Sequence, residues 1–303
     1  MKRTKIVGVC LVAALAMMGL SAMVASSASA GTYYWCQGQK KGNFTESGCK
    51  TVAEKKGVPD HKGKFELVPV SACVAQKHGN FTESGCKTVA EKKGKPDHKG
   101  GFEISKGRKF TDTTGKAKLA TPDLGPSDVE CTGSTSEGEI TSSTTGTDRV
   151  KFNGCTFEGK KCESVDLFGS GTASGESGTI ETNLLDTKLI DNGTKAGGYK
   201  HEEPALNEVW TEVVSSEKEP YSSEFICGTE IILRTHGSVS GVDTPVNSAP
   251  STTGVTTFGV GQGEQALLTE VFNGVEFIPS GGAPSSEETT STITNEVGIE
   301  IKS

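Results

Sequence analysis

The residues best suited to chemistry in this chain are its cysteines. The sequence contains nine, and all but Cys10 lie beyond an N-terminal segment with the features of an export signal. No pair of them forms a C-x-x-C arrangement of the kind that binds zinc or carries out redox exchange, so structural disulfides are the expected state outside a cell. The expected disulfide cysteines are Cys36, Cys49, Cys73, Cys86, Cys131, Cys155, Cys162 and Cys227.

The first four of these cysteines belong to a tandem repeat. The stretch GNFTESGCKTVAEKKG occupies residues 42–57 and recurs without change at residues 79–94. A unit that duplicated as a self-contained fold should close its own bridge, although exchange between the two copies is an open alternative. The expected bridges are Cys36–Cys49 and Cys73–Cys86.

The other four cysteines lie in the remainder of the chain. Cys155 and Cys162 bracket TFEGKK, in which residues 158–160 can turn a short hairpin and bring the two sulfur atoms opposite each other. Cys131 and Cys227 are then left as a pair by elimination.

Two Asp-His pairs place a carboxylate beside an imidazole, Asp60-His61 in one repeat and Asp97-His98 in the next. Such pairs can contribute to a metal site. Each repeat offers only these two ligands, however, and aspartate in a DHKG sequence is ordinary turn chemistry. The turn is the favoured interpretation, and no metal or other cofactor is expected.

Motifs for common enzymatic reactions are missing. The sequence has no G-x-S-x-G elbow, P-loop, H-E-x-x-H helix or EF-hand loop. His236 could join a neighbouring serine in a catalytic triad, but a strand histidine that faces solvent is commoner. The alternative to a non-enzymatic protein is a glycosidase-like hydrolase, which would use two carboxylates converging in a cleft. No pair of acids stands out, so the sequence favours a protein that is not an enzyme.

The elements that must position the first four cysteines are small. Ser47 or Ser84 could cap a short helix through CKTVAEKK, and the DHKG turn would lead from it into a short strand. A unit of about 35 residues rarely folds on hydrophobic burial alone, so each should depend on its disulfide. The expected modules span residues 31–69 and 70–107.

The chain from residue 108 to residue 303 changes to short alternating stretches separated by Gly, Ser, Thr and Asn. Asn273-Gly274 lies between TEVF and VEFI, a pattern typical of a β-hairpin. A hydrophobic content of 33% indicates several small cores or a thin sandwich rather than one large core. The expected fold class is therefore mainly β: two small disulfide-stapled α+β modules followed by an antiparallel β-sandwich or open-barrel body.

Residues 1–30 are typical of a secretory signal. A basic start precedes an apolar run, and an A-x-A cleavage site occupies residues 28–30. Removal of this segment would leave a mature chain with no transmembrane segment, secreted or associated with the cell wall.

Charge divides between the modules and the body. The formal net charge is −7, yet the modules are basic and the body is acidic. A basic module outside a cell could contact an anionic wall polymer, or its lysines could simply solvate a small module. Nucleic-acid binding is disfavoured because the aromatic residues are too few to stack bases. The candidate polymer contacts are Lys50, Lys55, Lys56, Lys62, Lys87, Lys92, Lys93 and Lys99.

Several stretches of the body resemble a widespread group of uncharacterised exported proteins of actinobacteria. They are CTGSTSEGEITSSTTGTDRVKFNGCTFEGKKC, SGTIETNLLDTKL, SEFICGTEIILRTHGSVSGVDTPVN and a TITNE sequence at residues 292–296. The similarity covers residues 110–303 and departs most at residues 199–221, while the modules resemble small Cys- and Lys-rich units seen fused to such proteins. The resemblance implies an envelope or extracellular protein and supplies no site residues. A secreted or envelope-associated interaction or structural protein is therefore expected.

Overall fold

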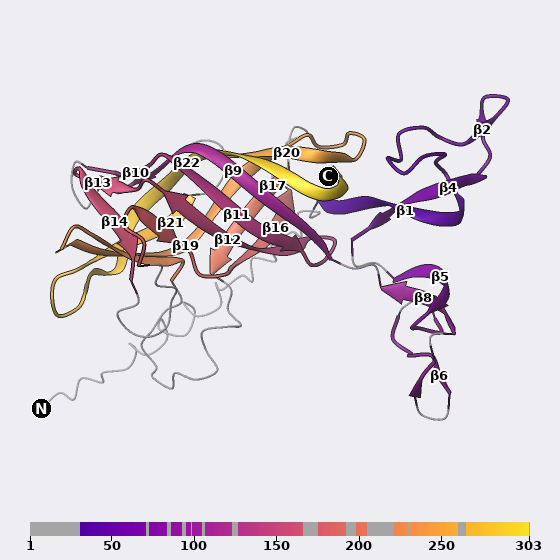
Figure 1. The fold of residues 1–303 in the computed structure, drawn as a ribbon, viewed down its shortest axis with the longest axis horizontal. Helices are drawn as coiled ribbons and strands as arrows, with labels where there is room; N and C mark the ends of the chain where they lie inside the picture. Colours follow the sequence, from indigo (N-terminus) through magenta and orange to yellow (C-terminus); the bar gives the residue numbers. More distant parts are fainter. Residues whose placement is uncertain are drawn as a thin grey trace, which may run out of the picture.

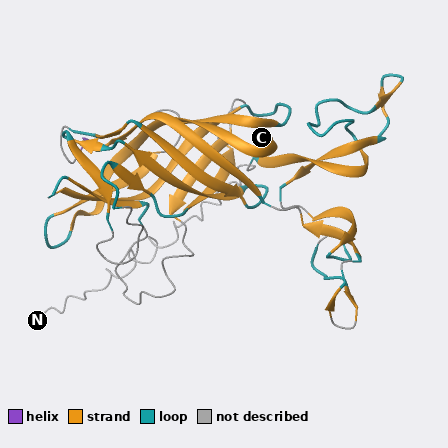
Figure 2. Ribbon diagram, viewed as in Figure 1, coloured by secondary structure: helices purple, strands orange, loops and turns teal. Residues whose placement is uncertain are grey.

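The computed structural model contains strands and turns in the part of the chain that it describes, and no α-helix (Figure 2). The expected export signal, residues 1–30, lies outside the described residues. Within the described part, no helix with the length and apolarity needed to cross a lipid bilayer is found. The described residues are 31–70, 73–83, 86–92, 95–97, 99–104, 107–122, 127–165, 175–191, 198–204, 221–229, 231–259 and 265–302.

The body forms one antiparallel sheet, which confirms the expectation of a mainly β protein. Its strands are β9 (Arg108–Ala120), β10 (Val129–Cys131), β11 (Gly133–Ile140), β12 (Thr145–Asn153), β13 (Thr156–Phe157), β14 (Lys160–Ser164), β15 (Thr179–Glu181), β16 (Leu185–Asp191), β17 (Gly198–Pro204), β18 (Ser223–Cys227), β19 (Ile231–Thr244), β20 (Ser251–Phe258), β21 (Gln265–Phe272) and β22 (Phe277–Lys302).

This sheet closes on itself to form a tube. Pairing runs from β9 through β11, β12, β16 and β17 to β19, then through β20 to β22, which pairs with β9 again. Strands β10, β13, β14, β18 and β21 continue the same ring at one end. Figure 1 shows the tube with its strands running obliquely across it. The expected sandwich or open barrel is therefore corrected to a closed sheet, whose closure pairs the strand edges around the ring.

The interior of the tube holds two small apolar clusters, in agreement with the low hydrophobic content. One contains Val129, Phe157, Phe225 and Leu233, and the other contains Tyr33, Val70, Phe110, Ile140, Leu189 and Ile299. Between the clusters, Asp112 on β9 and Ser136 on β11 occupy inward positions and are buried. The tube therefore has apolar ends and a polar middle.

The disulfides of the body differ from the expected pairs. Cys131 is bonded to Cys155 and Cys162 to Cys227, each with Cα atoms 4.0 Å apart. The expected bridges Cys155–Cys162 and Cys131–Cys227 are wrong. All four cysteines lie in one row across neighbouring strands, so Cys131 and Cys227 are separated by about 14 Å along the sheet. That distance is twice what a disulfide can span between Cα atoms.

The modules consist of short antiparallel pairs. In the first, β1 (Thr32–Gly42) pairs with β4 (Gly63–Pro69), and β2 (Glu54–Lys55) pairs with β3 (Val58–Pro59). In the second, β5 (Cys73–Gly79) pairs with β8 (Gly100–Ile104), and β6 (Glu91–Lys92) pairs with β7 (Lys95–Pro96).

The helix expected through CKTVAEKK is wrong for the first module, in which residues 49–56 are all described. Phe44 instead forms a β-bridge with Val52, the Ala53 N–H donates to the Asn43 carbonyl oxygen at 2.7 Å, and the Asp60 N–H donates to the Ala53 carbonyl oxygen at 2.9 Å. These bonds run across the module rather than along a helix. A helix of two or three turns has little stability by itself. The same backbone groups therefore form hydrogen bonds between separate segments of the module instead.

The bridge expected between Cys36 and Cys49 is present, with Cα atoms 5.6 Å apart. Cys86 is also disulfide-bonded, while the side chain of its expected partner Cys73 lies outside the described residues. The staple that the small size of the first module calls for is therefore in place.

The first module is joined to the tube by backbone pairing. Residues Thr32 to Trp35 of β1 lie antiparallel to the last residues of β22, along the edge that β9 leaves uncovered. The Arg108 guanidinium lies 3.6 Å from the centre of the Trp35 ring, and burial lowers the pKa of Arg108. Gly31 has no room for a side chain, because a Cβ would lie 2.9 Å from Leu189 Cδ2. Strand β1 thus closes this end of the tube.

Tryptic digestion without reduction should distinguish the two pairings of the body. Cleavage after the lysines and arginines of this region places each of the four cysteines on a separate peptide. We expect mass spectrometry to find peptide 119–149 linked to 152–160, and peptide 162–188 linked to 219–234. A link between 152–160 and 162–188 would contradict the pairing of Cys131 with Cys155 and of Cys162 with Cys227.

Replacing both Cys162 and Cys227 with alanine should lower the free energy of unfolding by about 4 kcal/mol, because their bridge closes a long loop in the unfolded chain. The bridge spans 65 residues of sequence, whereas Cys36–Cys49 spans 13. Denaturant titration of the double variant measures the loss. An unchanged midpoint would show that the bridge does not stabilise the tube.

Candidate functional site

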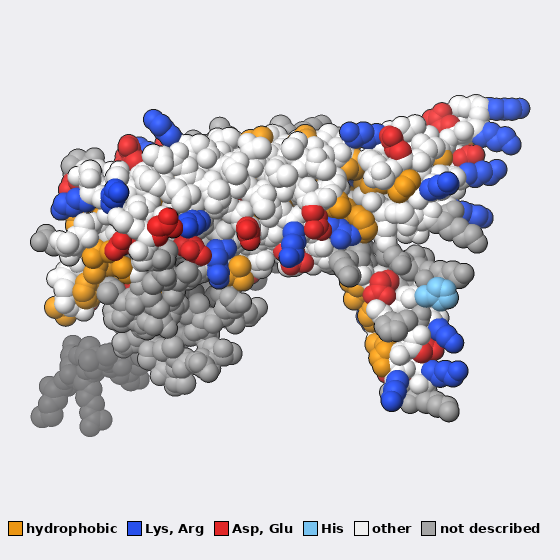
Figure 3. All heavy atoms as spheres, viewed as in Figure 1, with side chains coloured by type: hydrophobic (Ala, Val, Ile, Leu, Met, Phe, Trp, Pro, Cys, Tyr) orange, Lys and Arg blue, Asp and Glu red, His pale blue; other side chains and the backbone are white. Residues whose placement is uncertain are grey.

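Exposed lysines gather on the two modules, where Figure 3 shows their side chains projecting into solvent. None of these lysines takes part in the ion pairs found among the described residues. Lys93 lies outside the described residues. The exposed lysines of the candidate set are Lys50, Lys55, Lys56, Lys62, Lys87, Lys92 and Lys99.

Tight turns hold several of these lysines in place. Lys56 and Gly57 have positive φ angles of 56° and 76°, as the two central residues of a type I′ hairpin turn require, so Lys55 and Lys56 lie at the tip of the β2–β3 hairpin. The backbone N–H of Lys62 donates to Asp60 Oδ1 at 3.1 Å.

The second module repeats the turn formed at Asp60 in the first module, since the Lys99 N–H donates to Asp97 Oδ1 at 3.1 Å. The turn interpretation of the Asp-His pairs is thus confirmed for both aspartates, and His98 lies outside the described residues. Among the side chains that the structure describes, no group of three or more potential metal ligands comes together.

Two glutamates of the modules, Glu66 and Glu103, form hydrogen bonds within their own module. Glu66 accepts hydrogen bonds from the backbone N–H of Asn43 at 2.8 Å and from its side-chain Nδ2 at 2.7 Å. Glu103 accepts the same two bonds from Asn80, at 2.8 Å and 2.9 Å. These carboxylates brace the modules from within, while the lysine ammonium groups remain available to a partner.

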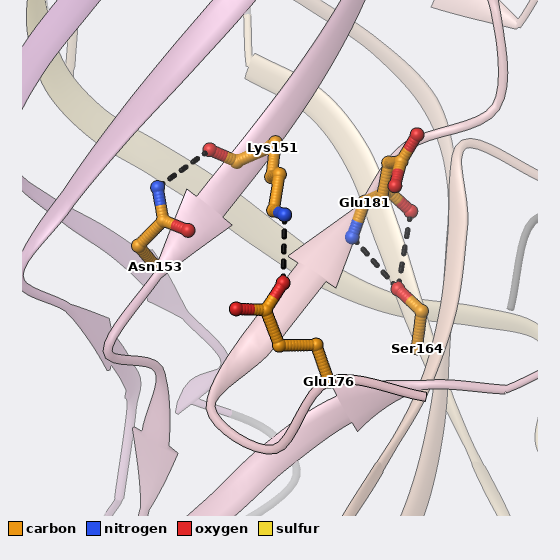
Figure 4. Close-up of polar contacts among 5 residues, drawn as sticks. All are labelled: Lys151, Asn153, Ser164, Glu176 and Glu181. Atoms are coloured by element: carbon orange, nitrogen blue, oxygen red, sulfur yellow. Dashed lines mark hydrogen bonds and ion pairs between the residues drawn. The ribbon is translucent and has the colours of Figure 1, made fainter. Parts of the chain in front are cut away.

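Some charges on the body are compensated, although Lys109, Lys116, Lys160 and Lys161 are exposed and take no part in the described ion pairs. Lys151 Nζ lies 2.7 Å from Glu176 Oε2, and this hydrogen bond, with the attraction of the charge, raises the pKa of Lys151. The Ser164 hydroxyl oxygen accepts a bond from the Glu181 N–H at 2.7 Å, which ties β14 to β15. Figure 4 shows these groups facing one another across the strands.

The hydrolase alternative requires two acids in a cleft, and the outer face of the tube has a hollow of about 580 Å³ lined by Glu137, Glu139 and Glu296 together with Lys109. All three carboxylates are exposed or half-exposed. A glycosidase also needs one acid in a buried site that raises its pKa, and none of the acids lining the hollow is buried.

A buried acid does line a cavity inside the tube. Asp243 is 3% exposed and accepts a hydrogen bond from the Thr256 hydroxyl. The adjacent cavity measures about 50 Å³, well below the several hundred Å³ of ordinary ligand sites. The acids in the hollow and the acid in the cavity thus each meet only part of the requirement for a glycosidase.

The sequence suggested that His236 faces solvent. In the structure it is buried: it is 7% exposed and lies 3.9 Å from Glu270. Nearby, Arg234 Nη2 lies 2.6 Å from Glu224 Oε2, and its guanidinium covers the Phe277 ring at 3.9 Å. Sequence reasoning missed this buried cluster. The alternation of Arg234 and His236 in LRTHG, which places both on one face of a strand, was the signal available.

Breaking the Glu224–Arg234 pair should be costly. The Glu224 side chain is 0% exposed, so Glu224→Gln removes one charge of a buried ion pair and should lower the free energy of unfolding by about 3 kcal/mol. Glu176→Gln is the matched control, because the Glu176 side chain is 61% exposed and its pair with Lys151 should contribute under about 1 kcal/mol. Equal shifts in the denaturant midpoint would contradict the burial argument.

Comparison with known proteins gives no relative from which a function could be inferred, so the argument for a function depends on the geometry of this chain. No protein-family model, curated protein or solved structure matches the chain. Within the described part, the feature most suited to binding is the set of exposed lysines on the two modules.

Proposed function

We propose that this chain is an exported, envelope-associated binding protein, and that its two lysine-rich modules contact an anionic cell-wall polymer. The observation that carries the proposal is the exposure of lysines that take no part in the described ion pairs. Disulfide bonds in the modules and in the body are consistent with an oxidising compartment outside the cytoplasm.

The energetics suit a polymer with many weak contacts. An ammonium and an anionic group 4 Å apart in water attract each other by about 1 kcal/mol, and salt screens most of this attraction. A lysine without an intramolecular partner breaks no ion pair when it binds. Repeated charges along a polymer allow several such contacts at once, so useful affinity needs no deep pocket.

The body serves as the support in this proposal. Backbone pairing of β1 with β22 fixes the first module to a closed sheet, and a partner bound to that module is therefore held at the surface of a firm structure. The glycosidase-like hydrolase is the alternative, supported by the hollow that contains Glu137.

The chain from residue 31 onward should sediment with purified cell wall at roughly 20 mM salt and be released near 1 M salt, because the Debye length falls to about 3 Å. Replacing Lys50, Lys55, Lys56 and Lys62 with glutamine should weaken binding about tenfold. The matched control replaces the exposed body lysines Lys109, Lys116, Lys160 and Lys161, which removes equal charge and should change affinity less than twofold.

Equal losses in the two variants would contradict a role for the modules, since net charge alone would then account for binding. Release of sugar fragments from the wall by the unaltered protein, abolished by Glu137→Gln, would favour the hydrolase instead. Sedimentation and fragment release are measured on the same wall preparation.

A further inference from the structure

The two modules differ at the tip of their small hairpins. Residues 42–63 and 79–100 are identical except at one position, where the first module has Val58 and the second has Lys95. Val58 is the direct partner of Lys55 across the β2–β3 hairpin, and Lys95 is the direct partner of Lys92 across β6–β7. The second module therefore places two lysines opposite each other.

This arrangement is unfavourable for the free protein. Direct partners on antiparallel strands have Cβ atoms about 5 Å apart, and like charges at such positions destabilise a hairpin. Both lysines are exposed, and neither takes part in the ion pairs of the described residues. Val58 occupies the same place in the first module, so the hairpin itself does not require a lysine there.

We propose that Lys92 and Lys95 form a phosphate-binding pair, and that the second module is the tighter of the two. The inference rests on the proposed function, for which it names the ligand chemistry as the phosphate groups of a polymer. A phosphodiester has two non-bridging oxygens that share its charge, so each ammonium can donate to one of them in a charge-assisted hydrogen bond. The bound anion relieves the repulsion between the lysines.

The hairpin position suits an extended ligand. Strands β6 and β7 lie at the far end of the second module in Figure 1, and Figure 3 shows lysine side chains projecting there. A polymer can reach the pair without entering a cleft. Lys99 belongs to the same module and is also exposed, but its backbone lies in the Asp97 turn rather than opposite another lysine.

The test uses the whole chain from residue 31 and a polyphosphate probe of defined length at low ionic strength. Lys95→Val, which copies the first module, should weaken binding about fivefold, whereas Lys99→Val should weaken it less than twofold. Val58→Lys should build a second pair on the first module and strengthen binding about fivefold. Thermal unfolding of each variant checks that the fold is intact.

The outcomes separate this inference from the function on which it rests. Equal effects of Lys95→Val and Lys99→Val would overturn the claim that Lys92 and Lys95 form a binding pair. The proposal of salt-sensitive wall binding would be unaffected. If the unaltered protein does not bind cell wall at low salt, the proposed function is overturned instead.

Two further probes test the ligand chemistry. A polygalacturonate probe carries carboxylates, and an equal response to Lys95→Val with that probe would overturn the choice of phosphate. Binding to phosphatidylglycerol vesicles, without binding to polyphosphate, would place the phosphate on a lipid and overturn the polymer assignment.

Discussion

The closure of one antiparallel sheet is the constraint on which the rest of this molecule depends. Strand β22 is the seam: it pairs with β9, β20, β21 and β1 along its length. Backbone hydrogen bonds around the ring hold together a chain whose interior has two small apolar clusters and a polar middle. The tube can therefore persist with a modest hydrophobic content, because pairing and cross-strand disulfides supplement burial.

The body and the modules differ in how their carboxylates are used. On the body, Lys151, Arg234 and Lys118 each lie against a carboxylate, which limits what these cations can offer a partner. On the modules, Glu66 and Glu103 are engaged with asparagines, and the lysines project outward. The binding role proposed for the modules therefore rests on the use of these two carboxylates as much as on the position of the lysines.

Features that depend on residue types and their spacing were largely predictable, whereas those that depend on strand pairing were not. The Cys36–Cys49 bridge and the Asp60 turn involve residues close in sequence, and both were expected correctly. The module helix was wrong because Ala53 bonds to Asn43 across the unit. The lysines were found by composition, but the opposition of Lys92 and Lys95 needs the hairpin register, and the burial of His236 and Glu224 needs the packed tube.

The sequence by itself determined the repeat, the cysteines available for bridging, the uneven charge and the strand-forming character of the body, since these depend on composition and short-range periodicity. Only the tertiary structure decided that the sheet closes and that Cys155 bonds to Cys131 rather than to Cys162. Both outcomes depend on which strands become neighbours. That choice is made by pairing energies summed over residues far apart in the chain, so short-range patterns could not reveal it.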